Sequence, residues 1–238
     1  MILMDYFSKL SFGSTGWGDD LLLGAAMTLL LALGALLIGM LIAAILAACK
    51  IQPVKPLRGL AHGITLLFRG TPEFLIILVV FFGLDILINA LFAALEINLV
   101  ASTPKYWAGA LGLGLIFGVY ASEVLKGAYQ AVQSGQIEAA SSLGLNRWQT
   151  LTLIRIPLLW RHALPGLMNL WLVLLKDTSL VAVIAFDELL RTAKVAGETE
   201  REPFLFFLAA AGLYLLMTWV SDRLRRQVET RVALVGRG

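Results

Sequence analysis

Cysteine, histidine and charge are scarce in this chain of 238 residues. The single cysteine, Cys49, excludes an intrachain disulfide framework and any metal site that needs several cysteines. The two histidines, His62 and His162, lie too far apart in the sequence to suggest a metal cluster. The chain has no GxxxxGK(S/T) phosphate-binding loop, which excludes an ATPase site of that type. We therefore expect no cofactor, no metal and no enzymatic activity of its own.

Charged residues make up only 15% of the chain, and hydrophobic residues make up 59%. Soluble domains usually contain about 25% charged and about 45–50% apolar residues, so one soluble core cannot bury this excess. Apolar runs of roughly 18 residues or more are long enough to cross a bilayer as helices. Such runs occupy residues 21–49, 72–93, 105–130, 164–186 and 204–221. The expected fold is all-α and integral to the membrane, with five transmembrane helices in one domain over residues 1–238.

The distribution of lysine and arginine predicts how these spans are oriented. Five spans place the two termini on opposite sides of the membrane. Segments 50–71, 131–163 and 222–238 hold twelve lysines and arginines, whereas the segments on the other side hold five. Cytoplasmic segments carry the excess of basic residues in membrane proteins. The sequence thus predicts the N-terminus outside and the C-terminus inside, with the arginines of 222–238 near inner lipid headgroups.

The segment between the third and fourth apolar runs is a polar island. Its pattern predicts two short helices, the first over 137–143 and the second over 147–156. Gly144 has the place of a left-handed C-cap, Asn146 that of an N-cap, and Pro157 is expected to end the second helix. From the residues alone, two interpretations stay open: an amphipathic helix on the inner membrane surface, or a docking element for a cytoplasmic partner.

One motif in this polar island separates the two interpretations. It consists of an acidic residue, two alanines, a glycine, an isoleucine and a proline at fixed spacing: Glu138, Ala139, Ala140, Gly144, Ile154 and Pro157. This spacing resembles the EAA signature of ABC importer permeases, EAA-x3-G-x9-I-x-L-P, and departs from it only at Ile156, where the signature has leucine. The resemblance implies a type I (MetI-like) importer permease fold. It also implies that 138–157 is a coupling region that docks into a cleft on a separate ATPase subunit.

Other stretches extend the resemblance over nearly the whole chain. They are Arg69–Pro72, Tyr120–Ala128, Trp160–Gly166, Trp171–Leu180 and Glu202–Phe204. These stretches are similar to the polar amino acid permeases of histidine, arginine and opine importers, and look most like the Q permease subunit of arginine importers. The resemblance implies three kinds of protein partner: a pair of ABC ATPase subunits, a second permease, and a periplasmic or extracellular amino acid binding protein. It further implies a place in the bacterial inner membrane among lipids, an amino acid substrate with arginine favoured, and no nucleic acid partner.

The fourth apolar run is interrupted by the polar residues Lys176, Asp177, Thr178 and Ser179. A lysine or aspartate at the centre of a spanning helix costs about 2.5–3.5 kcal/mol on insertion scales, so these residues need paired, wet or protein-lined surroundings. Successive residues of an α-helix point about 100° apart, so Lys176 and Asp177 cannot share a narrow face unless the helix is locally irregular. Glu123 of the third run is an expected partner for Lys176, in a structural pair that holds two spans together.

The alternative is that these polar groups line a substrate cavity. A free amino acid carries a carboxylate and an ammonium group, and a basic amino acid adds a second cation. Asp177 and Glu123 are candidates to receive the cations, whereas the hydroxyls of Thr178 and Ser179 are candidates to hydrogen-bond the carboxylate. Lys176 is also a candidate site residue, with a structural counter-charge as its other interpretation.

Two functions from different classes fit the sequence. The first is the permease subunit of an ATP-driven importer, in which a partner subunit hydrolyses the ATP. The second is an autonomous secondary transporter or channel powered by an ion gradient, which intramembrane charges would suit. The odd number of spans, the absence of an evident internal repeat and the EAA signature favour the first.

Overall fold

The computed structural model describes residues 8–13, 16–95, 97 and 102–234 of the chain. All regular secondary structure in these residues is helical. Five helical runs are long and apolar enough to cross a membrane: Gly18–Ile51 (α2), Glu73–Ala94 (α4), Lys105–Ala131 (α5), Arg147–Ile184, and Pro203–Gln227 within α10 (Pro203–Leu234). The expected all-α fold with five apolar spans is confirmed.

The run Arg147–Ile184 is not one uniform helix. It consists of α7 (Arg147–Gln149), a π-helical turn (Thr150–Arg155), α8 (Ile156–Asp177) and a 3₁₀-helix (Thr178–Ile184). The change from α-helix to 3₁₀-helix falls within the polar stretch of the fourth run, so the helix is locally irregular there. Three further helices connect the spans: α3 (Lys55–Gly70), α6 (Ser134–Ser142) and α9 (Leu189–Glu200).

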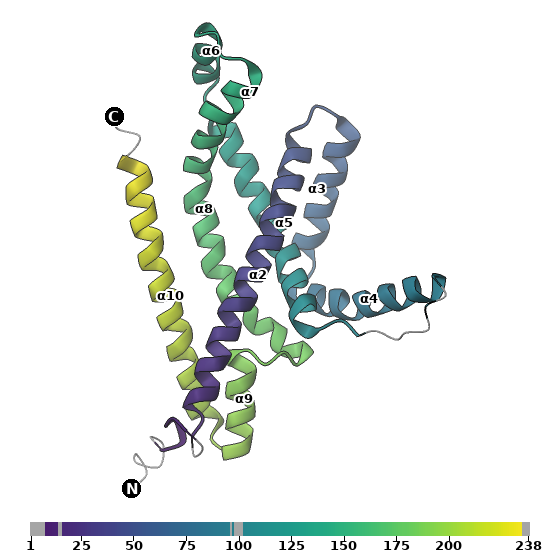
Figure 1. The fold of residues 1–238 in the computed structure, drawn as a ribbon, viewed down its shortest axis with the longest axis vertical. Helices are drawn as coiled ribbons and strands as arrows, with labels where there is room; N and C mark the ends of the chain where they lie inside the picture. Colours follow the sequence, from purple (N-terminus) through teal and green to yellow (C-terminus); the bar gives the residue numbers. More distant parts are fainter. Residues whose placement is uncertain (1–7, 14–15, 96, 98–101, 235–238) are drawn as a thin grey trace.

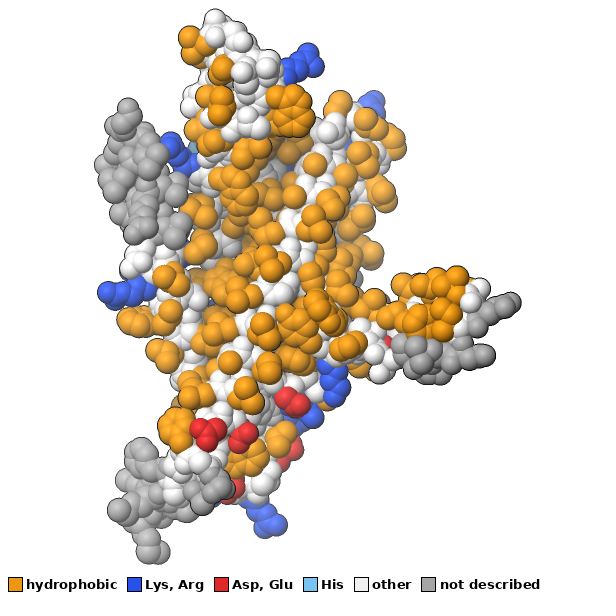
Figure 2. Space-filling model, viewed as in Figure 1, with side chains coloured by type: hydrophobic (Ala, Val, Ile, Leu, Met, Phe, Trp, Pro, Cys, Tyr) orange, Lys and Arg blue, Asp and Glu red, His pale blue; other side chains and the backbone are white. Residues whose placement is uncertain are grey.

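The long helices form a bundle with two distinct ends (Figure 1). The helices α2, α5, α8 and α10 run along the long axis, whereas α4 projects sideways. The start of α2 lies with α9 at one end, and α6 and α7 form the tip of the other. Figure 2 shows hydrophobic side chains covering the flank between these ends, with acidic side chains near the α9 end. This surface suits a bilayer, and which end faces the cytoplasm stays a prediction.

Glycines allow α2 and α5 to approach closely. A Cβ atom added to Gly39 would lie 2.8 Å from the carbonyl oxygen of Gly114. A Cβ atom added to Gly118 would lie 2.8 Å from the side chain of Ile42. Because there is no room for a methyl group, the two helices pack backbone to backbone, as small residues allow in membrane bundles. This pair of helices is the centre of the main hydrophobic core.

A second hydrophobic core holds the α9 end together. It buries Leu21 of α2, Leu189 of α9 and Phe206 of α10. The ring of Trp17 packs edge-to-face on Phe206, with the ring centroids 6.3 Å apart. The helix α9 is therefore fixed against the spans α2 and α10 by this core.

The span α4 has little support from the rest of the chain. Only Ile76 and Ile77 are buried within it, whereas Phe82, Ile86 and Leu91 are exposed. An apolar surface of this extent needs either lipid or a protein partner to cover it.

The prediction that Pro157 ends the second cytoplasmic helix is wrong. The helix α8 begins at Ile156 and continues through Pro157 and Pro165 to Asp177. A proline is tolerated in the first turn of a helix, where its missing N–H is not needed. The wider π-helical turn Thr150–Arg155 precedes this first turn, so a new α-helix, α8, begins at Ile156 with Pro157 in its first turn.

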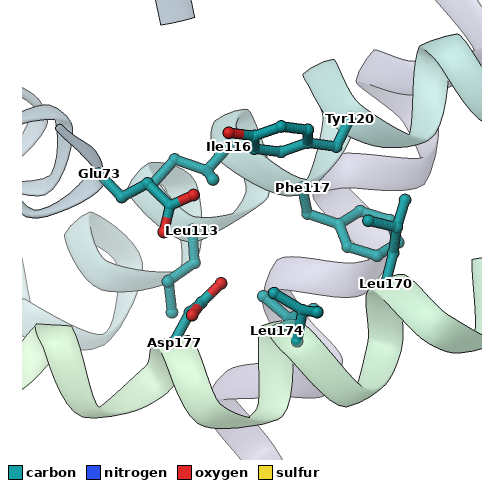
Figure 3. Close-up of a pocket in the computed structure, with 9 residues that line it drawn as sticks. Glu73, Leu113, Ile116, Phe117, Tyr120, Leu170, Leu174 and Asp177 are labelled. Carbon is teal, nitrogen blue, oxygen red and sulfur yellow. The ribbon is translucent and has the colours of Figure 1, made fainter. Parts of the chain in front are cut away.

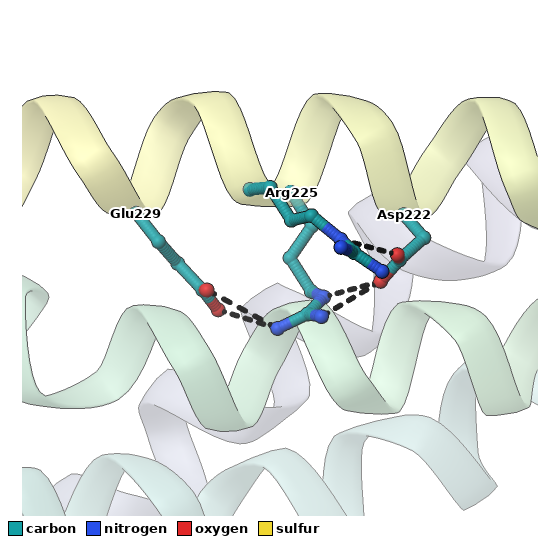
Figure 4. A network of polar contacts seen from close by, with 4 residues as sticks. Asp222, Arg225 and Glu229 are labelled. Atoms are coloured by element: carbon teal, nitrogen blue, oxygen red, sulfur yellow. Dashed lines mark hydrogen bonds and ion pairs between the residues drawn. The ribbon is translucent and has the colours of Figure 1, made fainter.

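The last turns of α10 carry a charge network of their own (Figure 4). Arg225 pairs with Asp222 at 2.7 Å and with Glu229 at 2.9 Å, and Arg226 pairs with Asp222 at 2.8 Å. These pairs lie one turn apart on one helix, and such pairs contribute only about 0.3–0.5 kcal/mol each. The network offsets part of the basic charge at this end, and contact of Arg223, Arg225 and Arg226 with lipid headgroups stays a prediction.

Candidate functional site

A cavity of about 310 Å³ lies between α4, α5 and α8. Most of its wall is apolar, from α5 and α8: Leu113, Ile116, Phe117, Leu170, Val173 and Leu174. Its polar groups are two carboxylates and one phenol: Glu73, Asp177 and Tyr120 (Figure 3). A mostly apolar wall with a few convergent polar groups is typical of a small-molecule site, and the volume is at the lower end of the usual range.

The carboxylates of Glu73 and Asp177 point toward one another across the cavity (Figure 3). Glu73 lies in the first turn of α4, where the helix dipole favours a negative charge. Asp177 is the last residue of α8, where the dipole disfavours a negative charge. The two carboxylates also repel each other. This arrangement therefore favours a cation between them.

A positive group lies beside the same cavity. The guanidinium carbon of Arg69, in the last turn of α3, is 5.9 Å from the ring centroid of Tyr120. The Tyr120 hydroxyl points toward Glu73 (Figure 3). The cavity thus combines negative groups on one side with a cation near its phenol, which is the charge pattern that a zwitterion requires.

The structure separates the four polar residues of the fourth run. Asp177 lines the cavity, whereas Lys176 is exposed. Thr178 is fully buried and donates its hydroxyl hydrogen bond to the Leu175 carbonyl, at 2.7 Å. Ser179 donates to the Lys176 carbonyl, at 2.7 Å. Of these four residues, Asp177 alone is part of the cavity wall.

Glu123 has a different partner from the expected one. Lys50 of α2 lies 2.7 Å from its carboxylate and 2.6 Å from the Ser122 hydroxyl. Lys126 approaches the same carboxylate at 3.9 Å. The predicted pair of Glu123 with Lys176 is wrong, because Lys50 and Lys126 hold this carboxylate. The Lys50 side chain is fully buried, so the pair ties the end of α2 to α5.

Two residues of the cavity were not predicted as site residues. Tyr120 lies within a stretch that carried the family resemblance and Glu73 directly follows another, but neither was assigned a role. The available signal for Glu73 is its position directly after Arg69–Pro72, as an acidic residue inside an apolar run. An intramembrane acidic residue is a functional hypothesis by default.

The EAA motif forms a helical hairpin at the tip of the bundle, opposite α9. Gly144 has φ +80°, which confirms its left-handed conformation after α6. Asn146 caps α7: its side chain accepts from the Gln149 N–H, and the Gln149 side chain accepts from the Asn146 N–H, both at 2.9 Å. Arg155 fastens the hairpin to α5 through the Tyr129 hydroxyl, at 2.6 Å.

A groove of about 450 Å³ opens between the two halves of this hairpin. The motif residues Ala139, Ala140, Ile154 and Pro157 line it. Leu143 also lines the groove and is 82% exposed, and Glu138, next to Ala139 in the chain, is exposed as well. An apolar groove in a rigid hairpin that stands clear of the bundle is a suitable contact surface for another protein.

A membrane bundle with a mostly apolar cavity that contains two facing carboxylates, and with a protruding helical hairpin, has the features of the membrane-spanning part of a transporter. The chain belongs to the family of binding-protein-dependent transport system inner membrane components, whose model matches residues 35–234. It is therefore a multi-pass inner membrane protein and the permease component of an ABC importer. The family's description implies a binding protein as a partner, and an ABC importer implies an ATPase.

Individual relatives agree with this assignment. The chain is 36% identical over 228 residues to the octopine transport system permease protein OccQ of Rhizobium radiobacter, covering 96% of each chain. It is 35% identical to the histidine/lysine/arginine/ornithine transport system permease protein HisQ of Salmonella typhimurium, covering 92% of this chain and 96% of the relative. The solved structure of an amino acid ABC transporter with histidines superposes with a TM-score of 0.76 at 28% identity, covering 90% of this chain and 95% of that chain.

Proposed function

We propose that the chain is the permease subunit of an ATP-driven importer for amino acids or opines that carry a cationic side chain, with arginine favoured. The observation that carries this proposal is the pair of facing carboxylates, Glu73 and Asp177, in an otherwise apolar cavity. The named substrates of the relatives support it, because octopine permeases and histidine/lysine/arginine/ornithine permeases are among them.

The charges of the cavity suggest how such a substrate binds. The cationic groups of the substrate lie between Glu73 and Asp177, where each contact of about 4 Å gains about 4 kcal/mol at an effective dielectric constant of about 20, before desolvation. Arg69 receives the carboxylate at the Tyr120 side, since a guanidinium binds a carboxylate through two parallel hydrogen bonds. Thr178 and Lys176 support the position of Asp177 from outside the cavity.

The roles proposed for the remaining sequence candidates follow from their contacts. Ser179 contributes to the 3₁₀-helix through its backbone-directed hydrogen bond. Glu123 acts as the counter-charge of Lys50. The coupling groove of the hairpin receives the ATPase subunit through Ala140, Ile154 and their neighbours.

The other proposed partners cover surfaces that the chain leaves exposed. A second permease covers the exposed face of α4, since one chain of this size does not enclose a pathway. The α9 end lies outside and meets the binding protein, and the hairpin end lies in the cytoplasm. ATP-driven closure of the ATPase pair then moves the hairpin and switches the cavity between outward and inward access, as a rigid-body transition.

The test is binding of radiolabelled L-arginine to the complete complex in lipid nanodiscs. Asp177→Asn and Glu73→Gln should each weaken binding by about tenfold or more, since each removes a contact worth about 1.4 kcal/mol or more. Glu229→Gln, which neutralises a carboxylate of the α10 charge network outside the cavity, is the matched control and should leave the affinity unchanged. L-citrulline, which has the shape of arginine without its side-chain charge, should bind much more weakly than L-arginine. Unchanged affinity in both cavity variants removes the cavity as the substrate site.

The autonomous secondary transporter is the alternative, and the ATPase separates the two. Proteoliposomes with the complete complex should take up L-arginine only when ATP is supplied. Uptake by the permease alone that follows a proton gradient is the result that would support the alternative.

A further inference from the structure

Glu188 is a fully buried carboxyl group that the proposed substrate site does not use. It is the N-cap of α9, and its two oxygens accept hydrogen bonds from the Leu190 and Arg191 N–H groups, each at 2.8 Å. A third donor comes from another span: the Tyr214 hydroxyl of α10 donates to Oε2 at 2.9 Å. A serine or asparagine at the protein surface would cap this helix equally well. The buried carboxylate with its tyrosine partner therefore calls for a further reason, because burying such a group is costly.

The Tyr214 hydroxyl connects α9 to the neighbourhood of the cavity. The side chains of Thr178 and Thr28 both lie near this hydroxyl. Thr28 of α2 also accepts a hydrogen bond from the Leu189 N–H, at 3.2 Å. Thr178 directly follows Asp177 and begins the 3₁₀-helix. Neighbouring polar side chains thus extend from the first turn of α9, through the half-buried Tyr214, to the residue next to the cavity aspartate.

The backbone between these points is rigid and strained. The 3₁₀-helix Thr178–Ile184 is followed by Ala185 in the left-handed region, with φ +57°. A non-glycine residue in this region is strained, and such strain persists only where the surroundings enforce it. The Lys105 ammonium group donates to the Ala185 carbonyl at 3.0 Å and holds this conformation. Such a rigid segment transmits a displacement of α9 to Asp177, because the segment has little freedom to absorb the displacement.

We infer that Glu188 and Tyr214 are positioning residues for Asp177: they tie α9 to the start of the 3₁₀-helix, so that the place of the Asp177 carboxylate in the cavity depends on the place of α9. The inference rests on the proposed function, because that proposal assigns substrate contact to Asp177. The exposed face of α9, with Lys194 and Glu198, is where a partner at this end would press. A partner that contacts this face of α9 changes the substrate affinity of the cavity without contacting the cavity.

The central experiment is Tyr214→Phe in the complete complex, with Kd for L-arginine and basal ATP hydrolysis measured in nanodiscs. This change removes one hydroxyl and keeps the ring, so we expect the Kd to rise about three- to tenfold, which corresponds to the net contribution of one ordinary hydrogen bond. Basal ATP hydrolysis should stay unchanged, since the hairpin groove lies at the other end of the bundle. Tyr106→Phe is the matched control: it removes a hydroxyl that donates at 3.3 Å to the Leu30 carbonyl and has no contact with Glu188. Its Kd should equal that of the wild type.

A double-mutant cycle with Asp177→Asn tests whether Tyr214 acts through Asp177. If it does, Tyr214→Phe should have little further effect on the Kd in the Asp177→Asn background. An equal rise in both backgrounds overturns the inference, as does an unchanged Kd in a folded Tyr214→Phe complex. Failure of the proposed function looks different, because then Asp177→Asn itself leaves the Kd unchanged. If Tyr214→Phe does not assemble, Glu188→Gln carries the same cycle, with the same expected rise in Kd.

Discussion

The buried Lys50 and its partner Glu123 give the sharpest stability prediction. The Lys50 side chain is 0% exposed, whereas the Glu123 side chain is 34% exposed. Removing one partner of a buried ion pair costs about 3–5 kcal/mol when the remaining charge has no access to water. Glu123→Gln creates this situation, because it leaves the Lys50 ammonium buried with the Ser122 hydroxyl as its remaining close acceptor. We expect it to lower the free energy of unfolding by about 3 kcal/mol or more.

The reverse substitution should cost less. Lys50→Met leaves Glu123 with partial access to solvent and with Lys126 at 3.9 Å. Its expected cost is about 1–2 kcal/mol, because a partly solvated carboxylate is not a fully unpaired charge. The double variant Lys50→Met/Glu123→Gln has no buried charge left, so it should recover most of the loss, as replacements of buried ion pairs by neutral groups do.

The assay is unfolding in detergent, followed by helix content, for the wild type, both single variants and the double variant. An order of stability with Glu123→Gln below Lys50→Met, and a double variant above both, is the expected result. Additive losses in the double variant would refute the reasoning. The same set tests the sequence hypothesis that Glu123 contacts substrate: the double variant, restored in stability, should bind L-arginine with wild-type affinity if Glu123 is structural.

Three further substitutions test other parts of the fold. Gly118→Ala should destabilise the chain by about 1–3 kcal/mol, because the new methyl group meets Ile42 at 2.8 Å. Gly127→Ala in the same helix is the control, because its new methyl group meets nothing within 4 Å. The control should be neutral or stabilising in the same unfolding assay. Asn146→Ala should cost about 1 kcal/mol of local helix stability, because it removes the capping box of α7. It should also reduce the ATP hydrolysis that substrate-loaded binding protein stimulates in the complex. Unchanged stimulation argues against a rigid hairpin as the coupling element. Burial raises the pKa of Glu188 above its ordinary value of 4.5, so its protonation contributes stability that is present below pH 4.5 and lost as the pH rises through the folded-state pKa. In Glu188→Gln, the curve of melting temperature against pH should be flatter over this pH range. An identical slope in both proteins contradicts this prediction.

Local features of the fold were predictable wherever a few neighbouring residues determine them. The five spans follow from the length of the apolar runs, because bilayer thickness fixes the length of a helix that crosses it. Gly144 and Asn146 were predictable because left-handed and capping positions depend on the residue itself and its next few neighbours. Pro157 was not, because a proline ends a helix or begins one according to the hydrogen bonding of the turn before it. That turn is π-helical here, and the sequence Thr150–Arg155 carries no obvious sign of it.

The site was harder to predict because its residues meet only through tertiary packing. Asp177 was identified as a charge that a lipid-facing position would not tolerate, and it does line the cavity. Its facing carboxylate, Glu73, is more than a hundred positions away, and only the packing of α4 against α5 and the 3₁₀-helix brings the two together. For the same reason Glu123 was assigned the wrong lysine. The sequence alone allows either Lys50 or Lys176 to pair with Glu123, and the way that α2 and α8 are rotated about their axes decides between them.

The charges of the cavity connect these observations to the sparse packing of α4. Two carboxylates that face each other, one at an unfavourable helix end, repel and favour separation of α4 from α8. A cation between them reverses the sign of this interaction. Because Ile76 and Ile77 are the only residues of α4 that the rest of the chain buries, little apolar packing opposes movement of this helix. Substrate binding on the proposed function therefore draws α4 toward the bundle, and the same charges that select the cationic substrate also make the packing of this span depend on its presence.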